Sequence, residues 1–250
     1  MTRFFVGSDN ISSDRVFLGP EDAEHVKVLR MKIGERFIVC DGAGRDYLCC
    51  LGEASGREAW GEILDSYDCP AEPSVYCRVF AAYPKGDRSD YIVQKCTELG
   101  VSEIVFFNSA CSVSRPEGKS VSKKILRWQR IAHEAAKQSG RGRIPVVSAV
   151  SGFEDAVAGV METRLPMMMY ELGSEGRLAL RSVLKTAGTA GGFESVGIIT
   201  GPEGGFTAEE AGYALGEGVK LCSMGPRILR CETAPVAALT AVMLFSGNLD

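Results

Sequence analysis

The chain has few of the side chains that hold metals. It contains two histidines, His25 and His133, and nine cysteines that form no Cys-x-x-Cys pair. Zinc sites need clustered thiolate and imidazole ligands. Scattered cysteines in odd number are also unsuited to a disulfide framework. We therefore expect no metal site and reduced, mostly buried thiols, with Cys231 as the thiol of interest because it lies in a glycine loop.

Long hydrophobic runs are also absent. No apolar stretch approaches the roughly 20 residues of a membrane span, and 45% hydrophobic with 24% charged residues is ordinary for a globular chain. The first six residues, Met1 to Val6, turn polar too soon for a signal peptide. We expect a cytoplasmic protein that does not bind membranes.

Two common phosphate-binding patterns are missing. The chain has neither Gly-x-Gly-x-x-Gly after a strand nor Gly-x4-Gly-Lys-Ser/Thr. No Ser/His/Asp set and no paired-carboxylate site emerges, so hydrolytic enzyme classes have little support.

The first 70 residues predict a small β-barrel. Short strand-like segments with turn signals occupy residues 3–6, 16–18, 36–40, 47–51 and 60–66, and one helix is expected at 20–29. Pro70 and Pro73 mark a linker, because prolines so close block both helix and central strand. We place the first domain at 1–70 and the second at 74–250.

The second domain alternates strands and helices. Apolar strands are predicted at 75–83, 103–107, 144–150, 167–172, 196–200 and 220–224, with a helix at 89–99. Strands separated by helices of this length favour a parallel α/β sheet with the ligand at the carboxyl ends of the strands.

Two glycine loops follow two of these strands, at residues 201–205 and 224–234. Glycine allows positive φ and close approach of a ligand to the backbone. Glu203 would repel a phosphate, so a neutral or cationic ligand is favoured, and S-adenosylmethionine, with a sulfonium and no phosphate, fits. Either loop alone could be a plain tight turn; together they predict one cleft.

A basic segment covers residues 112–143, with nine Lys/Arg against Glu117 and Glu134. On a helical wheel, Lys123, Arg127, Arg130, Glu134 and Lys137 share one face, opposite Val121, Ile125, Trp128, Ala132 and Ala135. The alternative is a merely solvated face. Residues 138–143 extend the charge past the helix end, where a flexible loop could follow a phosphate backbone. On the helix of the first domain, Lys27, Arg30 and Lys32 could contact RNA backbone, whereas catalysis by His25 is improbable.

The final helix, predicted at 232–246, is rich in alanine and aliphatic residues and has Pro235 in its first turn, where proline is tolerated. A helix that is apolar on most sides is buried in a core or packed against another subunit.

Together these motifs resemble the ribosomal RNA small-subunit methyltransferase E family of the SPOUT superfamily. The resemblance spans essentially the whole chain and rests on these motifs: His25-Val26-Lys27-Val28-Leu29-Arg30-Met31, Asp41-Gly42, Lys85, Gln94-Lys95, Glu98-Leu99-Gly100-Val101, Arg127-Trp128, Glu134-Ala135-Ala136, Gln138-Ser139, Arg141, Pro145, Gly201-Pro202-Glu203-Gly204-Gly205, Gly225-Pro226-Arg227 and Leu229-Arg230-Cys231-Glu232-Thr233-Ala234.

The resemblance implies an N-terminal PUA-like RNA-binding barrel, a C-terminal trefoil-knotted α/β methyltransferase domain and a homodimer. It also implies methylation of N3 of one uridine, U1498 in the usual 16S rRNA numbering, using S-adenosylmethionine, with 16S rRNA or the small ribosomal subunit as partner. Alternatives are a SPOUT enzyme that methylates a ribose 2′-hydroxyl and a non-catalytic ribosome-assembly factor that binds RNA.

The expected site residues follow. Arg230 is assigned to the uridinate or its phosphate, because arginine stays protonated and can stabilise that anion, and Glu232 is assigned as its orienter or as proton acceptor. The expected cofactor contacts are Tyr170, Glu171, Leu172, Thr200, Gly201, Glu203, Gly204, Gly205, Met224, Gly225, Ile228, Leu229, Thr233 and Ala234. The expected RNA contacts are Arg3, Lys27, Arg30, Lys85, Arg115, Arg127, Arg130, Gln138 and Arg141.

The chain departs from the family at one loop. The family commonly carries an arginine before a Ser-Val pair, and this chain has Cys111 before Ser112-Val113. Arg115 is the candidate to replace that arginine.

Overall fold

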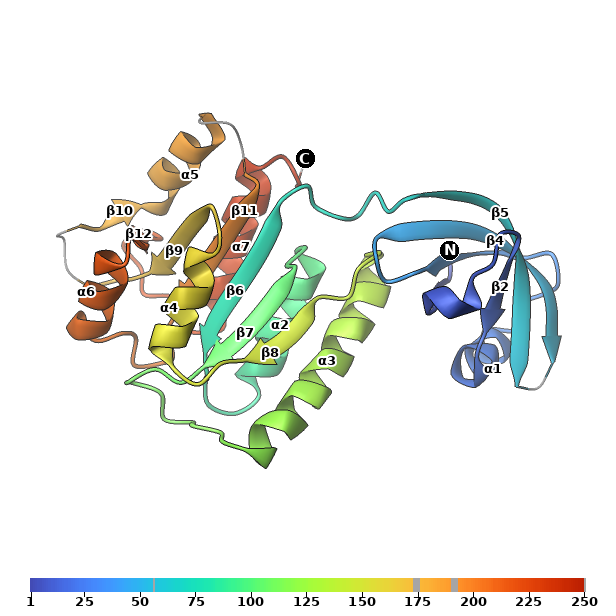
Figure 1. The fold of residues 1–250 in the computed structure, drawn as a ribbon, viewed down its shortest axis with the longest axis horizontal. Coiled ribbons are helices and arrows are strands. Elements are labelled where there is room, and N and C mark those ends of the chain that lie inside the picture. The colour runs from blue at the N-terminus through green and yellow to red at the C-terminus, as the bar shows by residue number, and fades with distance from the viewer. Residues whose placement is uncertain (56, 173–175, 190–192, 250) are drawn as a thin grey trace. The chain divides into compact units, whose positions relative to one another are not determined.

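The computed structural model describes residues 1–55, 57–172, 176–189 and 193–249, which form two compact units (Figure 1). The first unit comprises Met1–Glu72 and Ala136–Ile144, and the second comprises Pro73–Ala135 and Pro145–Asp250. Residues 136–144, which the sequence analysis assigned to the second domain, thus belong to the first unit. The chain therefore passes between the units three times.

The first unit is built on one five-stranded sheet. Its strands, β1 (Arg3–Phe5), β2 (Arg15–Leu18), β3 (Arg36–Cys40), β4 (Arg45–Ser55) and β5 (Glu58–Asp68), have the spatial order β1-β3-β4-β5-β2. Only the β1–β3 pairing is parallel. A short 3-10 helix, η1 (Ser8–Asn10), precedes β2, and α1 (Pro20–Val28) follows it.

The core of the first unit lies between this sheet and α1. Val16 and Leu18 alternate with exposed residues on β2 and pack with Phe4, Phe37 and Val26, all of them buried. This alternation is typical of a sheet with one face on the core and one in solvent.

Residues 136–144 are held in the first unit by Glu72. The Glu72 carboxylate pairs with the Arg141 guanidinium at 2.9 Å and accepts the backbone N–H groups of Gly142 and Arg143 at 2.9 and 3.0 Å. The side chains of Arg141 and Glu72 are only 3% and 14% exposed. The sequence predicts here a loop that could follow a phosphate backbone, whereas in the structure Glu72, a carboxylate far away in the sequence, binds this loop.

The second unit contains a seven-stranded, wholly parallel sheet of order β10-β12-β9-β11-β6-β7-β8. The strands are β6 (Tyr76–Ala82), β7 (Glu103–Phe107), β8 (Val146–Ala149), β9 (Leu165–Met169), β10 (Leu178–Ala179), β11 (Ser195–Thr200) and β12 (Lys220–Ser223). The described helices are α2 (Arg88–Glu98), α3 (Lys119–Ser139), α4 (Phe153–Met161), α5 (Leu180–Thr189), α6 (Ala208–Gly216) and α7 (Thr233–Phe245).

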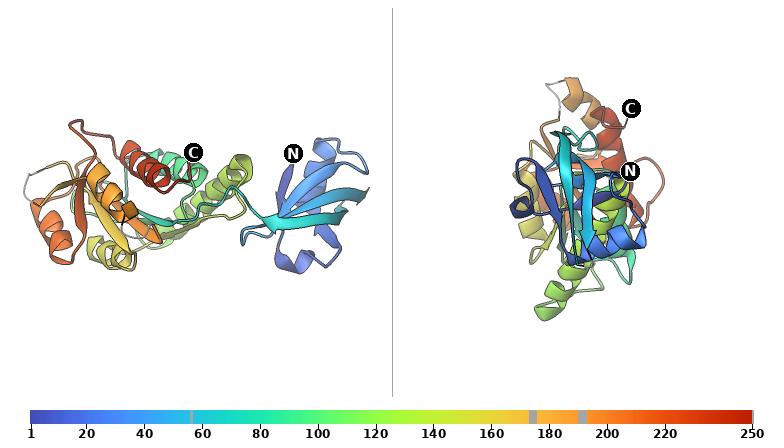
Figure 2. Two further views of the ribbon diagram at one scale, coloured as in Figure 1. Left: turned by 90° about the horizontal axis from the view of Figure 1, so that it is seen from above. Right: turned by 90° about the vertical axis from the view of Figure 1, so that its right-hand side faces the viewer.

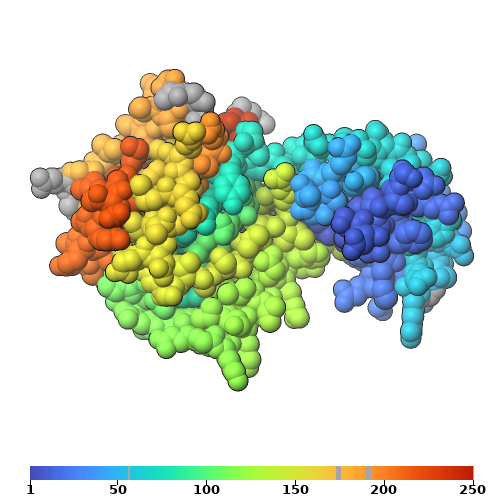
Figure 3. Space-filling view, viewed as in Figure 1, coloured from blue at the N-terminus to red at the C-terminus, as the bar shows by residue number. Residues whose placement is uncertain are grey.

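Helices cover both faces of this sheet (Figures 1 and 2). On one face, α4 and α6 pack over a core that includes Phe80, Phe107 and Ile199. On the other face, Trp128 of α3 lies 4.3 Å from the Phe106 ring, centroid to centroid, and α7 contacts β11, β6 and α2. The surface over α4 and α6 is seen in yellow and orange in Figure 3.

Gly197 in β11 permits the close approach of α4. A Cβ at this position would lie 2.3 Å from Cγ2 of Val160 and 2.8 Å from the Thr163 hydroxyl. A larger residue would force the helix off the sheet.

The strands β4 and β5 are longer than predicted, β9 is shifted, and β10 was not predicted. β9 begins two residues early, because Pro166 is tolerated near the start of a strand, and ends at Met169, so Tyr170 and Glu171 lie beyond it. β10 has two residues, too few for a periodic signal.

The wheel predicted for residues 121–137 is confirmed for most of its length. Trp128, Ala132 and Ala135 are buried, whereas Arg127 and Arg130 are exposed. Lys137 differs, since its ammonium lies 3.1 Å from Nδ1 of His25 and over the Phe4 ring in the first unit. Within the described ranges, every helix is too short or too polar to cross a lipid bilayer.

Removing one partner of the Arg141–Glu72 pair leaves the other charge buried. We expect Glu72→Ala to lower the free energy of unfolding of the first unit by about 3 kcal/mol, measured by urea denaturation. Arg164→Ala is the matched control, because its pair with Glu194 is 77% and 72% exposed and such pairs contribute less than about 1 kcal/mol. Equal effects of the two substitutions would contradict the structural role of Glu72.

Candidate active site

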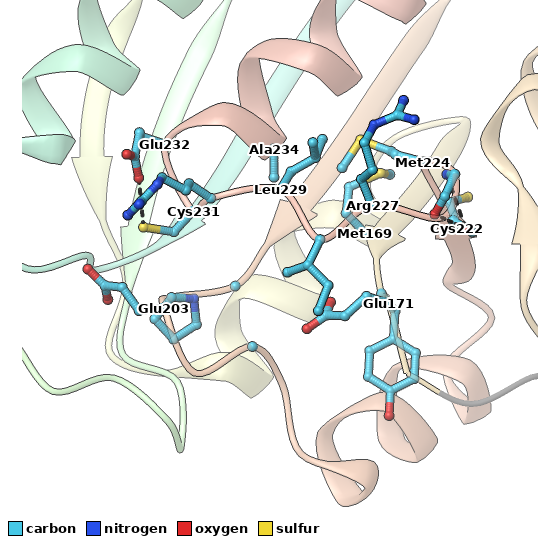
Figure 4. Close-up of a pocket in the computed structure, with 18 of the residues that line it drawn as sticks. Met169, Glu171, Glu203, Cys222, Met224, Arg227, Leu229, Cys231, Glu232 and Ala234 are labelled. Atoms are coloured by element: carbon cyan, nitrogen blue, oxygen red, sulfur yellow. Dashed lines mark hydrogen bonds between the residues drawn. The ribbon is translucent and has the colours of Figure 1, made fainter.

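A pocket of about 240 Å³ lies in the second unit, at the carboxyl ends of β9, β11 and β12. Parallel strands bring these ends to one edge of the sheet. It is lined by the ends of β9 and β12, three loops, and the first residues of α2 and α7, most of which Figure 4 draws: Arg88, Met169, Tyr170, Glu171, Gly201, Pro202, Glu203, Gly205, Cys222, Ser223, Met224, Gly225, Arg227, Ile228, Leu229, Arg230, Cys231, Glu232 and Ala234.

Two glycines shape the wall of this pocket. Gly205 and Gly225 have φ values of +68° and +104°, a region that L side chains rarely adopt. A Cβ on Gly205 would come within 2.6 Å of Oε1 of Glu171. The backbone of the first loop therefore lies close to the Glu171 carboxylate, and the positive φ at Gly205 favours glycine there.

Charged groups gather at one end of the pocket. The Arg88 guanidinium pairs with the Glu203 carboxylate and lies 3.6 Å from Oε2 of Glu232. Glu203 also accepts the backbone N–H of Lys85 at 2.9 Å. One arginine thus joins the loop after β6, the first glycine loop and the start of α7.

These contacts determine the ionisation state of Glu203. Burial raises the pKa of Glu203, but the backbone N–H groups of Lys85 and Glu203 and the Arg88 charge outweigh it and lower the pKa below its usual value. Glu203 therefore stays ionised and balances Arg88.

Cys231 lies beside these carboxylates (Figure 4). Burial, followed by the hydrogen bond to Glu232 and the charges of Glu203 and Glu232, raises the pKa of the Cys231 thiol to about 12. The thiol remains protonated at neutral pH and donates to Oε2 of Glu232 at 3.2 Å. It is a hydrogen-bond donor rather than a nucleophile.

Three charged lining residues have no ion-pair partner among the residues that the structure describes. They are Glu171, Arg227 and Arg230. Arg227 and Arg230 are exposed at the mouth, next to Ile228, which is 80% exposed. The pocket thus offers ligands one carboxylate and two guanidinium groups that pair with no other charge in the described part of the chain.

Most of the expected cofactor contacts line this pocket, together with Arg230 and Glu232. Four of them do not. Leu172 is 54% exposed, and Thr200 is buried with its hydroxyl near the Phe80 carbonyl. Thr233 is exposed at the start of α7, and a Cβ on Gly204 would meet Cβ of Cys111 at 3.0 Å rather than the pocket.

Several residues that line the pocket are not among the expected cofactor contacts: Arg88, Met169, Pro202, Cys222, Ser223, Arg227 and Cys231. Met169, Cys222 and Ser223 end strands β9 and β12, so the rule that ligands bind at carboxyl ends could have found them. Arg88 carries no comparable signal, because it is more than 100 residues from either glycine loop.

Two of the expected RNA contacts have carboxylate partners within the first unit. Arg3 forms two 2.8 Å contacts with the fully buried Asp46, and Arg141 is buried against Glu72. Neither guanidinium is available to a phosphate, because each is used inside the first unit.

The remaining expected RNA contacts occupy several elements. Arg115 donates to the carbonyls of Ser109, Ala110 and Ser112, so it braces the loop that carries Cys111. Arg127 pairs with Asp90 but is 62% exposed. The others, Lys27, Arg30, Lys85, Arg130 and Gln138, are exposed. No group of metal ligands occurs among the described residues.

Residues 71–243 match the model of an RNA methyltransferase domain, and residues 18–64 match that of an RNA methyltransferase PUA domain. The chain is 34% identical over 224 residues to a ribosomal RNA small subunit methyltransferase E of Bacillus subtilis, an alignment that covers 89% of this chain and 87% of the relative.

Two solved structures are similar over nearly the whole chain. One is a ribosomal RNA small subunit methyltransferase E from Neisseria gonorrhoeae bound to S-adenosyl methionine, 29% identical with a TM-score of 0.80 over 97% of each chain. The other is a methyltransferase from Legionella pneumophila in complex with the same cofactor, 26% identical with a TM-score of 0.80 over 98% of each chain.

Substitution of Gly205 tests whether this pocket binds the cofactor. Gly205→Ala strains the backbone, at a φ of +68°, by about 1–2 kcal/mol and displaces the Glu171 carboxylate from the loop, so we expect S-adenosylmethionine to bind at least about tenfold more weakly in calorimetry. Gly212→Ala is the control, because a Cβ there has no neighbour within 4 Å. Unchanged affinity of a folded Gly205→Ala variant would show that the cofactor binds elsewhere.

Proposed function

Since the chain belongs to the ribosomal RNA small subunit methyltransferase E family, we propose that it transfers the methyl group of S-adenosylmethionine to N3 of one uridine in 16S rRNA. The observation that carries this proposal is the pocket in which glycine loops, Arg230 and Glu232 meet at one sheet edge. A 16S rRNA substrate also implies that the protein acts in the cytoplasm.

Family membership confirms several expectations. The fold is an α/β RNA methyltransferase domain with a parallel sheet and a small PUA-like domain, and the protein is an RNA methyltransferase whose cofactor is S-adenosylmethionine. The alternative of a non-catalytic assembly factor is therefore wrong.

The residues of the pocket suit this cofactor. Gly201, Gly205 and Gly225 line the pocket, so a ligand can approach their backbone without meeting a side chain, and Glu171 offers a carboxylate to hydroxyl or cationic groups. Glu203 does not serve as a free anion, because Arg88 already balances it. When bound, the cofactor supplies an electrophilic methyl group on a positively charged sulfur.

The residues of this chain must stabilise and deprotonate the uridine base. N3 of uridine carries a proton that must leave before or during methyl transfer, and the base becomes anionic. Arg230, which has no ion-pair partner among the described residues, can stabilise that charge where it develops.

Glu232 is the proposed proton acceptor. Its carboxylate has a hydrogen bond from Cys231 and an arginine 3.6 Å away, and both interactions orient it at the rim of the pocket. Carboxylates so held act as general bases when the proton lies within hydrogen-bond reach.

Substitutions of Arg230 and of the α3 arginines should separate the methyl-transfer step from RNA binding. We expect Arg230→Ala to reduce single-turnover methylation of 16S rRNA by about 100-fold or more while sparing most RNA affinity. Arg127→Ala with Arg130→Ala should weaken RNA binding, lower its salt slope by about 2, and leave cofactor affinity unchanged. An Arg230→Ala enzyme that methylates at the wild-type rate would contradict the catalytic role assigned to Arg230.

We also propose a homodimer that uses α7. One stripe of α7, including Ala238, Leu239 and Val242, is buried in the protomer, whereas Leu244 and Phe245 are 54% and 37% exposed. Ala237 and Ala241 are only half-buried beside them. Isologous packing is the commonest way to cover such a surface.

Light scattering tests the dimer. Leu244→Glu places a charge on the proposed interface and should convert the dimer to a monomer. Leu215→Glu on α6, also exposed at 45%, should leave the mass unchanged. A wild-type chain that is a fully active monomer would contradict the proposal.

A further inference from the structure

A buried carboxylate lies at the start of α6. Glu210 is 9% exposed and is the third residue of this helix, whose N-cap is Thr207. Oε2 of Glu210 accepts the Thr207 N–H at 3.0 Å, and the Thr207 hydroxyl accepts the Glu210 N–H at 3.1 Å. This reciprocal pair is a capping box, which fixes the first turn of a helix. The cap uses one oxygen of the carboxylate and leaves the other available to a second partner.

The second oxygen binds a segment that is 100 residues away in the sequence. Oε1 of Glu210 accepts the backbone N–H of Ala110 at 2.8 Å. Ala110 belongs to residues 108–115, which follow β7 and which we call the β7 loop. A buried carboxylate is costly unless hydrogen bonds satisfy it, and here two N–H groups from different segments do so. The bond therefore ties the β7 loop to α6.

The β7 loop also contacts the first glycine loop, residues 201–205. A Cβ on Gly204 would lie 3.0 Å from Cβ of Cys111 and 3.5 Å from its carbonyl oxygen. The other four residues of the glycine loop line the cofactor pocket. The glycine loop therefore meets the β7 loop at the one of its residues that does not line the pocket, so the position of one loop constrains the other.

Hydrogen bonds within the β7 loop make it stiff. The Ser112 N–H donates to the Ser109 carbonyl at 3.0 Å, and the Ser112 hydroxyl accepts the Ser109 N–H at 3.1 Å. The Arg115 guanidinium donates to three carbonyls of the same loop at 2.7–3.2 Å. Because the loop is connected in this way, its attachment at Ala110 also fixes the place of Arg115, which is exposed.

We propose that Glu210 is a positioning residue for methyl transfer. By accepting the Ala110 N–H, it holds the β7 loop against the glycine loop, so that RNA bound at Arg115 and the cofactor bound beside Gly205 lie at a fixed separation. Glu210 does not line the pocket and acts only through the two loops. Group transfer depends steeply on such placement, because a shift of about 1 Å can slow it about 100-fold. The proposal rests on the proposed function in taking methyl transfer to 16S rRNA as the reaction, whichever atom receives the methyl group.

Glu210→Gln tests the attachment while it keeps the helix cap. Glutamine is also common at this position of a capping box, but its single carbonyl oxygen cannot accept both N–H groups. We expect the single-turnover rate constant for 16S rRNA, at saturating protein and cofactor, to fall about tenfold. An unfolded fraction does not change this rate constant, because the folded protein still saturates the RNA.

Binding should separate from the rate in the same variant. Affinity for S-adenosylmethionine in calorimetry and for 16S rRNA in filter binding should stay within about twofold of the wild type, because no group that faces either ligand changes.

Glu209→Gln is the matched control. Glu209 precedes Glu210 in the first turn of α6 and is exposed. Its substitution removes the same charge from the same helix end, and none of its hydrogen bonds among the described residues reaches the β7 loop. We expect this variant to methylate at the wild-type rate.

Ala110→Pro removes the other partner of the same hydrogen bond. Ala110 is the second residue of the turn that the Ser109 carbonyl and the Ser112 N–H close, and its φ is not positive. Proline is favoured at this position of a turn and has no N–H to donate. We expect the same loss of rate, and no further loss when Ala110→Pro and Glu210→Gln are combined, since both remove one interaction.

Hydrogen exchange measures the attachment without an assay of activity. Amide protons of residues 108–115 should exchange faster in Glu210→Gln than in the wild type or in Glu209→Gln, because the loop opens more often.

Four results would overturn the proposal. They are a wild-type rate in Glu210→Gln, rate losses that multiply in the double variant, unchanged exchange of residues 108–115, or a slower reaction explained wholly by weaker binding of cofactor or RNA. If the wild-type chain transfers no methyl group to 16S rRNA, the proposed function fails, and hydrogen exchange still decides whether Glu210 holds the β7 loop.

Discussion

The parallel direction of all seven strands in the second unit is the constraint on which the site depends. Parallel pairing brings the segments after β9, β11 and β12 to one edge, although they are separated by tens of residues in the sequence. No single loop could enclose a ligand, and the pocket exists because three loops emerge together. The burial of the strands, with every residue of β9 buried, keeps that edge rigid.

Arg88 adds a second level of organisation to this edge. Its guanidinium neutralises Glu203 and approaches Glu232, so the glycine loop and the beginning of α7 share one cation. The pair is partly exposed, so its contribution to stability is small. Its effect is positional, because Glu232 is held at the rim beside a protonated Cys231 rather than free to rotate.

Much of the fold could be predicted because its signals are local. The strands at 36–40 and 103–107 coincide with β3 and β7, and α2 differs from its predicted helix by one residue at each end. The two glycine loops also indicated where the pocket lies. Glycine is favoured where the backbone has a positive φ or approaches a ligand closely, so its positions can be read from the sequence.

Long-range pairing was the part that could not be predicted. In the sequence, Arg141 and Arg3 look like RNA contacts because they are positively charged. Only the folded chain brings Glu72 and Asp46, their buried partners, next to them. For the same reason the sequence could not assign residues 136–144 to the first unit or find Arg88 in the pocket. Gly204 has the right residue type, but its neighbour is Cys111 rather than the pocket.

The central claim is that this pocket directs a methyl group to a uridine base. The most direct measurement is nucleoside mass spectrometry of small-subunit rRNA from cells that lack this protein, compared with the same cells carrying the wild-type chain. We expect N3-methyluridine to be absent without the protein and to return with it. A modification that returns as a ribose 2′-O-methyl nucleoside, or rRNA whose N3-methyluridine content does not depend on the protein, would contradict it.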